Sequence, residues 1–390
     1  MILRKIVYVD NAATSKVRAE VIESMIPFLS DSFGNPSSIY SIGREAKRAL
    51  EKARKTISEC INASEEEIIF TSCGSESDNF AIKSSYESRG EKNHIITSKI
   101  EHHAVLKTVK SLKNVDSSYI SPDEFGVIKP ETLEKEIRKD TFLVSIMHAN
   151  NEIGTLEPIE ELSEVCRKNN VIFHTDAVQS VGHVEVDVKK LGVDMLSASA
   201  HKFNGPKGVG FLYIKKGLRI PAFISGGAQE RNLRAGTENV SSIVGMAKAL
   251  EISVGGLESN KKKLDFLQSK LVERVLKIDK TILTGHPKKR IPGSCSFCFL
   301  GVEGESILLN LDQLGICASS GSACTSGSLD PSHVLLSIGL SHEVAHGSLR
   351  ITLGHENTME DVDYICDSLP PIINKLRVMS PVWEKYSKRL

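Results

Sequence analysis

The sequence has few cysteines for its length, no excess of charge of either sign, and no apolar run near the roughly 20 residues that a membrane span needs. Eight cysteines scattered over 390 residues lack the density of a disulfide scaffold, so we expect reduced thiols and a cytoplasmic location. Because 49 Lys and Arg balance 49 Asp and Glu, no overall field favours nucleic acid or an anionic membrane surface. Charged residues interrupt the apolar stretch at the N-terminus, which is typical of a short strand rather than a signal peptide.

Short apolar runs alternate with amphipathic stretches between about residues 65 and 215, and we interpret the runs as buried strands. The predicted strands cover residues 67–70, 94–97, 142–147, 171–174, 195–197 and 209–214. Helical spacing over residues 130–138 and 159–169 fills two of the gaps. The alternation predicts an α/β fold with a mainly parallel sheet that helices cover on both faces.

The pattern changes after about residue 240, where longer helical stretches take over. We expect helices over 240–276, with a break at Gly255-Gly256, over 303–314, and over 358–375, with an interruption at Pro370-Pro371, and a strand over 294–299. The length suits about two domains. We predict a large domain over residues 16–260 and a smaller α+β C-terminal domain over residues 261–390, with residues 1–15 packing against the smaller one.

Two chemically matched residues follow neighbouring predicted strands. Lys202, in Ser199-Ala200-His201-Lys202, comes where strand 195–197 ends, and Asp176 follows strand 171–174. A lysine amine can form a Schiff base with an aldehyde cofactor, and a carboxylate can keep a pyridine nitrogen protonated so that the ring takes up electrons. The pair predicts pyridoxal 5'-phosphate (PLP), although a single lysine after a strand is more often a solvated surface charge.

The segment 71–76, Thr-Ser-Cys-Gly-Ser-Glu, lies between a predicted strand and a helical stretch. Its small residues would let backbone N–H groups and hydroxyls surround an anion at the start of the helix. The segment fits neither the dinucleotide nor the Walker-type glycine pattern, so a cofactor with a single phosphate suits it better. An ordinary capped turn explains the same residues.

Other polar side chains also follow predicted strands. His102 follows strand 94–97, and its ring could stack on a planar cofactor and move protons. With His103 it could instead bind a metal, but no C-x-x-C or H-E-x-x-H partner is nearby. The amides of Asn151 and Gln179 could bind a phenolic oxygen or a substrate carboxylate, or belong to turns. Ligands of open α/β sheets gather beyond the carboxyl ends of the strands, which favours one shared site.

Cys324 stands in the Ser-Gly-rich segment 318–329. We expect a thiol among such residues to be exposed on a mobile loop, which favours nucleophilic or carrier chemistry over an inert linker cysteine.

Cys295-x-x-Cys298 has a metal-like spacing, but in a strand the two side chains face opposite sides. Arg350 could clamp a substrate carboxylate or be a solvated surface charge.

Taken together, the chain resembles the cysteine desulfurases of the NifS/IscS group, which are fold-type I, class V PLP-dependent enzymes. The resemblance extends from about residue 8 to about residue 383. Its most specific segments are Phe-Gly-Asn-Pro-Ser-Ser at 33–38, Ala-His-Lys at 200–202 with Gly-Pro-Lys-Gly at 205–208, Arg-Ala-Gly-Thr-Glu-Asn at 234–239, and the Cys324 segment.

The resemblance implies a role for each candidate residue. Lys202 would carry PLP, Asp176 would pair with its pyridine nitrogen, Gln179 would contact its phenolic oxygen, and His102 would stack on its ring. The phosphate would be held by Gly74, Ser75, Ser199 and His201, with Thr237 reaching in from the second subunit of a homodimer. Asn151, itself close to the cofactor, and Arg350, with Asn35 nearby, would bind the carboxylate of L-cysteine.

The implied reaction converts L-cysteine to L-alanine and leaves the sulfur on Cys324 as a persulfide. An iron–sulfur scaffold protein or another sulfur-relay acceptor would then receive it, so Cys324 could lie near an iron–sulfur cluster during transfer without a resident metal. Position 73 is a cysteine in this chain, whereas several relatives have a glycine there. Cys73 could be a bystander or a second reactive thiol. A class V aminotransferase, a selenocysteine lyase and a non-catalytic assembly partner remain alternative functions.

Overall fold

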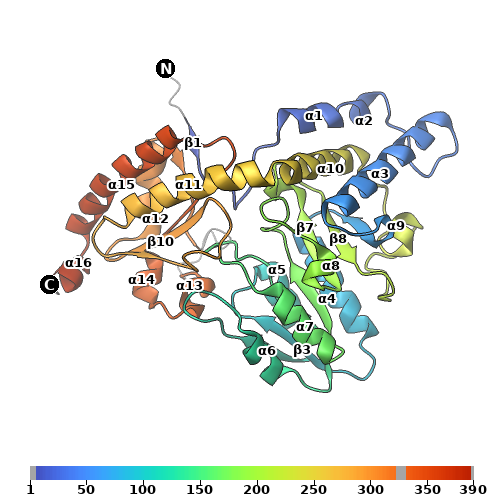
Figure 1. The fold of residues 1–390 in the computed structure, drawn as a ribbon, viewed down its shortest axis with the longest axis horizontal. Coiled ribbons are helices and arrows are strands. Elements are labelled where there is room, and N and C mark those ends of the chain that lie inside the picture. Colours follow the sequence, from blue (N-terminus) through green and yellow to red (C-terminus); the bar gives the residue numbers. More distant parts are fainter. Residues whose placement is uncertain (1–5, 322–330, 388–390) are drawn as a thin grey trace.

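The chain forms a seven-stranded sheet and a separate three-stranded sheet, each covered by helices (Figure 1). The computed structural model describes residues 6–321 and 331–387. The strands of the large sheet follow the spatial order β2 (Ile68–Thr71), β8 (Gly210–Ile214), β7 (Met195–Ser199), β6 (Ile172–Asp176), β5 (Thr141–Ser145), β3 (His94–Ser98) and β4 (Asp116–Ile120). Strands β3 to β7 run parallel, and β8 is antiparallel to both of its neighbours. The mainly parallel sheet predicted from the sequence is confirmed.

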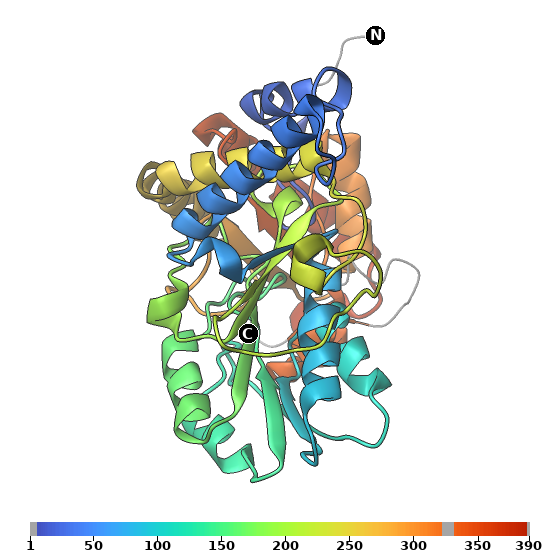
Figure 2. The ribbon, with the colours of Figure 1, turned by 90° about the vertical axis from the view of Figure 1, so that its right-hand side faces the viewer.

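Successive side chains of each strand pack alternately into two different cores, because neighbouring residues of a strand point to opposite faces of the sheet. Phe70, Leu196 and Phe211 pack on one face, whereas their chain neighbours Ile69 and Met195 pack on the other. The first face is covered by α3 (Ser41–Cys60), α7 (Ile159–Lys168) and α10 (Val240–Gly255), and the second by α4 (Gly74–Ser88) and α5 (His103–Ser111). In Figure 2 the green helix α7 and the cyan helix α4 lie on opposite sides of the strands.

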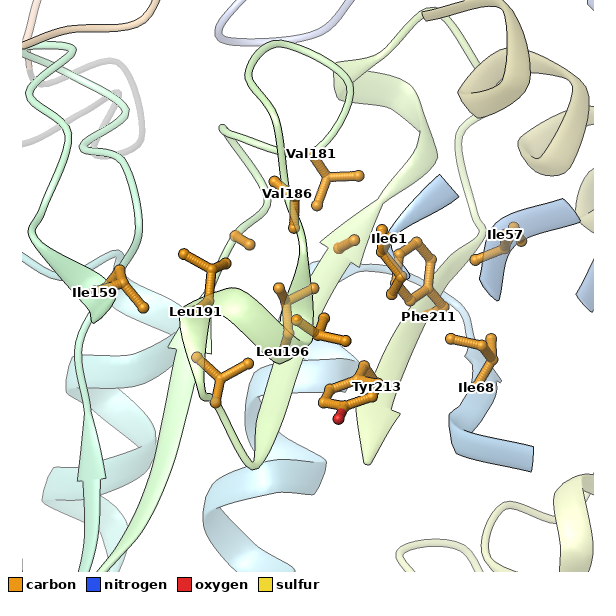
Figure 3. Close-up of a cluster of buried hydrophobic side chains, with 14 of the residues drawn as sticks. Ile57, Ile61, Ile68, Ile159, Val181, Val186, Leu191, Leu196, Phe211 and Tyr213 are labelled. Atoms are coloured by element: carbon orange, nitrogen blue, oxygen red, sulfur yellow. The ribbon is translucent and has the colours of Figure 1, made fainter. Parts of the chain in front are cut away.

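Figure 3 shows the first of these cores, where Leu196 and Phe211 from the central strands gather with Ile57 and Ile61 at the end of α3. All four side chains are almost completely buried. Their packing holds β7, whose carboxyl end carries part of the candidate site, against its antiparallel neighbour β8.

A second unit is built on the three-stranded antiparallel sheet with order β12 (Ser348–Thr352), β10 (Ser294–Phe299) and β9 (Thr281–Leu283). Its core includes side chains from α11 (Leu257–Val275), α12 (Gly304–Gln313) and α15 (Met359–Met379). The N-terminal strand β1 (Val7–Tyr8) pairs with β11 (Ile316–Cys317), and Val7 and Val9 join this second core. The predicted domain limits at residues 15 and 260 stay predictions.

The remaining elements are short. They are α1 (Ala19–Met25), α2 (Pro27–Ser30), α6 (Pro130–Glu136), α8 (Val188–Leu191), α9 (Gln229–Asn232), α13 (His333–Ser337), α14 (His342–His346), α16 (Trp383–Ser387) and two 3-10 turns, Glu65–Glu67 and Ala200–Lys202. Within the described residues no single helix is long and apolar enough to cross a membrane, and α10 with α11 passes that test only as a pair bent by 69°.

Several elements were missed or wrongly predicted from the sequence, and β4 and α15 show why. The edge strand β4 went unpredicted, because its start, Asp-Ser-Ser at 116–118, is polar and only its last residue is buried. Helix α15 runs without interruption through Pro370 and Pro371. Buried side chains on both sides of the prolines, such as Leu369 and Ile372, pack into one core, and this packing outweighs the lost backbone hydrogen bonds. The predicted break at Gly255-Gly256 is confirmed.

The two cysteines of the C-x-x-C segment face opposite sides of β10, as predicted. Cys295 packs in the core of the second unit, whereas Cys298 packs with Ile100 and Val334 in a cluster between the two units. In the described part of the chain, no group of three or more His, Cys, Asp or Glu side chains could hold a metal ion.

Replacing Phe211 by Ala should lower the free energy of unfolding by about 3–5 kcal/mol, because a fully buried aromatic side chain is lost and a cavity remains. Phe266→Ala on α11 is the matched control, since that side chain is 54% exposed, and should change stability by less than about 0.5 kcal/mol. Urea unfolding followed by circular dichroism measures both. Equal losses in the two variants would contradict this packing.

Candidate active site

A cavity of about 300 Å³ lies at the edge of the large sheet where the parallel strands end. Strand β8 is antiparallel to both β2 and β7, so β2 runs in the same direction as β3, β5, β6 and β7. Each of these five strands is followed by residues of the cavity wall. The wall includes Gly74 and Ser75 after β2, His102 after β3, Asn151 after β5, Asp176 and Gln179 at the end of β6, and Ser199, His201 and Lys202 at the end of β7.

Lys202 ends the 3-10 turn that follows β7, and its amine is held at the cavity wall. Nζ donates hydrogen bonds to the carbonyl oxygens of Ala12, at 2.5 Å, and Ala13, at 2.9 Å. The backbone carbonyl of Lys202 accepts from Nε2 of His183 at 2.9 Å. A Cβ at Gly205 would lie 2.9 Å from the carbonyl oxygen of Ala200, so glycine lets the chain turn tightly after the lysine.

Asp176 is the last residue of β6 and is 5% exposed. Burial raises its pKa to about 6, while a hydrogen bond from the Val178 amide and the charge of Lys202 act in the opposite direction. Asp78, on the first turns of α4, also lines the cavity; its burial, with the charge of Asp176, raises the pKa of its carboxyl well above the usual range. Of the two carboxyls that line the cavity, Asp176 is therefore charged above about pH 6, and the Asp78 pKa is shifted in the same upward direction.

His102 caps the N-terminus of α5, and its Nδ1 accepts from the Ala104 amide at 3.1 Å. Burial, together with the positive charge of Lys202, lowers the pKa of His102 to about 4. The imidazole is therefore neutral at physiological pH, and its fixed ring can stack on an aromatic group without adding charge.

The far end of the cavity offers unsatisfied hydrogen-bond donors. Helix α4 begins at Gly74, and Cys73 before it makes no side-chain cap. The hydroxyl of Ser199 is buried and has no hydrogen-bond partner among the described residues. A Cβ at Gly74 would lie 2.5 Å from Val178 Cγ2, so the backbone approaches closely here. These donors at a helix N-terminus suit an anion such as a phosphate group.

Arg350 lies on β12, in the second unit, where it lines the cavity and is 3% exposed. Its Nη1 donates to the carbonyl oxygen of Asn151 at 2.8 Å, and its Nη2 donates to Oδ1 of Asp10 at 2.9 Å. The alternative of a solvated surface charge is thus wrong for Arg350. A buried, oriented guanidinium beside Asn151 is a suitable binding group for a carboxylate.

Three predicted site residues are not found among the described residues that line this cavity. Asn35 and Thr237 are exposed and do not line it. Cys324 lies outside the described residues. Sequence reasoning missed Asp10 and Asp78, although Asp10 directly follows the N-terminal strand, as the other site residues follow theirs.

The residues present fit PLP. The cavity combines an amine, a buried carboxylate, a neutral ring and an anion site, which are the groups needed for the aldehyde, the pyridine nitrogen, the ring face and the phosphate. The unpartnered Ser199 hydroxyl is the clearest sign, because a buried polar atom without a partner is costly unless a ligand satisfies it. The role of each single residue stays a prediction.

Comparisons with known proteins agree with this fit. The sequence model of the aminotransferase class-V family matches residues 7–365. Cysteine desulfurase IscS of Methanosarcina thermophila is 51% identical over 389 residues, which cover 99% of this chain and 96% of that protein. A solved NifS-like protein is 41% identical, with a TM-score of 0.90 over 95% of this chain and 100% of that one. The structure of SspA in complex with cysteine is 36% identical, with a TM-score of 0.80 over 89% of this chain and 98% of that one.

The structural match confirms the fold-type I architecture expected from the sequence. The chain belongs to the aminotransferase class-V family of PLP-dependent enzymes, and within it to the cysteine desulfurases.

Proposed function

We propose that this chain converts L-cysteine to L-alanine with PLP bound at Lys202, and that Cys324 accepts the sulfur as a persulfide. The observation that carries the proposal is that Lys202, Asp176 and His102 line one cavity together with the buried Arg350. The cysteine desulfurase relatives and the cysteine-bound SspA structure support the choice of substrate.

Asp176 and Lys202, both at the sheet edge, have distinct tasks. PLP, when bound, supplies an electron-withdrawing ring that acidifies the substrate Cα–H bond and weakens the Cβ–S bond. Asp176, charged above about pH 6, keeps the pyridine nitrogen protonated. The Lys202 amine is the base that accepts the Cα proton, and the two carbonyl oxygens that it contacts keep it at the cavity wall.

Arg350 and Asn151 would hold the substrate carboxylate opposite the lysine. The guanidinium is fixed by two hydrogen bonds and is buried, so binding a carboxylate costs little side-chain entropy. This arrangement selects an α-amino acid and orients its Cα–H bond.

Cys324 would take the sulfur by direct attack. Its thiolate forms an S–S bond with the substrate sulfur as the Cβ–S bond breaks, and the carbon fragment keeps the electron pair and takes a proton to become alanine. Described residues before and after Cys324 in the chain lie near the cavity: Ser319 exchanges backbone hydrogen bonds with Arg350, and the Ser332 hydroxyl donates a hydrogen bond to Glu152, the neighbour of Asn151. This placement supports the reach of Cys324 to the substrate.

The proposal includes a homodimer, because Thr237 is exposed and outside the cavity of its own chain. Exposed apolar side chains near the N-terminus support a subunit contact; they are Ile22, Ile26, Leu29, Phe33 and Ile39. An iron–sulfur scaffold protein or another sulfur-relay acceptor, in the cytoplasm, would receive the persulfide sulfur. The described cysteines are all free thiols, in keeping with that location.

Replacing Cys324 by Ala should reduce alanine release from L-cysteine to below about 1% of wild type, because the sulfur loses its acceptor. The PLP absorbance band should be unchanged. Alanine is measured by chromatography, and Cys317→Ala, which alters a half-buried thiol seven residues away, should keep full activity. Full alanine release by the Cys324 variant would disprove the persulfide step, and a loss on Cys73→Ala instead would assign that step to Cys73.

Heterodimers test whether Thr237 acts across the subunit interface. We expect Lys202→Ala and Thr237→Asp each to abolish activity, the second because a carboxylate would repel the PLP phosphate. If Thr237 serves the partner's site, a mixed dimer of the two variants contains one intact site, and about half of the wild-type activity per dimer should return. Differently tagged subunits allow the mixed dimer to be isolated. An inactive mixed dimer would place Thr237 in the site of its own chain.

The pKa of Asp176 predicts how PLP binding depends on pH. The carboxyl is charged above about pH 6 and neutral below it, so its attraction for the pyridinium is lost as pH falls. The PLP affinity of wild type relative to Asp176→Asn should therefore shrink by up to about tenfold per pH unit below pH 6. Fluorescence titration of the PLP-free proteins measures both affinities. An affinity ratio that stays constant from about pH 5 to pH 8 would refute this role.

A further inference from the structure

The N-terminal turn of residues 10–13 contacts the candidate site at several points. Two carbonyl oxygens of the turn accept from Lys202 Nζ, and one of them, that of Ala12, also accepts from Nε2 of Gln179 at 3.0 Å. The side chain that begins the turn, Asp10, contacts Arg350, which comes from the second unit. The turn therefore contacts cavity-lining residues of both units.

Asp10 makes two side-chain hydrogen bonds. Its Oδ1 accepts from Nη2 of Arg350 at 2.9 Å, and its Oδ2 accepts from the hydroxyl of Ser319 at 3.0 Å. The Asp10 side chain is 16% exposed and that of Arg350 is 3% exposed, so little water competes for this ion pair. Ser319 is also part of the Ser-Gly-rich segment 318–329 that contains Cys324.

The orientation of Arg350 depends on Asp10 more than on any other described side chain. Its other contact is to a backbone carbonyl, that of Asn151, and its Nε has no hydrogen-bond partner among the described residues. The charge of Arg350 acts on the pKa of nearby Glu152, but the carboxyl of Glu152 accepts its hydrogen bond from the Ser332 hydroxyl rather than from the guanidinium. Without Asp10, the guanidinium would keep a single anchor and could rotate about it.

We propose that Asp10 is a positioning residue, which orients the Arg350 guanidinium so that it can bind the carboxylate of the amino-acid substrate. The inference rests on the proposed function, since it presupposes that Arg350 binds that carboxylate. A hydrogen-bond acceptor at residue 10 is what the role requires, and the negative charge alone is not sufficient.

Two neutral substitutions separate orientation from charge. Asp10→Asn loses the charge but keeps an oxygen that can accept from Arg350, whereas Asp10→Ala loses both. We expect Asp10→Ala to raise the Kd and the KM for L-cysteine about tenfold or more, as loss of a charge-assisted hydrogen bond implies, with kcat within about threefold of wild type. Asp10→Asn should stay within about threefold of wild type in all three constants.

The Kd values are measured by titrating the PLP-loaded proteins and following cofactor absorbance, and the KM and kcat values by alanine release. Cysteamine, which lacks the carboxylate, serves as the control ligand, and its Kd should be the same in both variants. Asp194→Asn is the control variant: this carboxylate also pairs with a cation, Lys215, but precedes β7 at the opposite end of the strand from the site.

Equal changes in the Asn and Ala variants, or an equal loss of cysteamine binding, would overturn the proposal. So would a failure of both Asp10→Ala and Asp10→Ser to fold, judged by melting temperature, since it would assign Asp10 a structural role. If wild type releases no alanine, the proposed function has failed, and the Kd values for L-cysteine and cysteamine still decide the role of Asp10.

Discussion

The common direction of five strands is the constraint on which the candidate site depends. Because β2, β3, β5, β6 and β7 run the same way, their carboxyl ends meet at one edge of the sheet. The turn after each strand places a small or polar residue there, so residues as far apart in the sequence as Gly74 and Lys202 line one cavity. The buried apolar side chains of both sheet faces hold the strands in this order.

Burial sets the chemistry of the site through its charges. An isolated buried charge is costly, and each charged group here has a defined partner. Lys202 contacts two carbonyl oxygens, and Arg350 pairs with Asp10. The same burial keeps His102 neutral and moves the pKa of Asp176 up to about 6. The cavity is thus lined by both a carboxyl, that of Asp176, and an amine, that of Lys202.

Much of the sheet and one wall of the site could be predicted from the sequence. Apolar runs that end at Asp176 or shortly before Lys202 identify buried strands and their carboxyl ends. These local patterns are enough to predict which polar residues follow each strand. The contact of Asp10 with Arg350 could not be predicted in this way, because it joins residues 340 positions apart. The continuous helix through Pro370 likewise depends on packing between distant segments, which no local pattern shows.

Covalent trapping of the cofactor tests the central claim most directly. After the protein is loaded with PLP, borohydride reduction fixes any lysine-bound cofactor, and mass spectrometry of the digested chain identifies the modified residue. The account predicts one modified lysine per chain, Lys202. A label on another of the chain's lysines, or a chain that binds PLP without any reducible link, would contradict it.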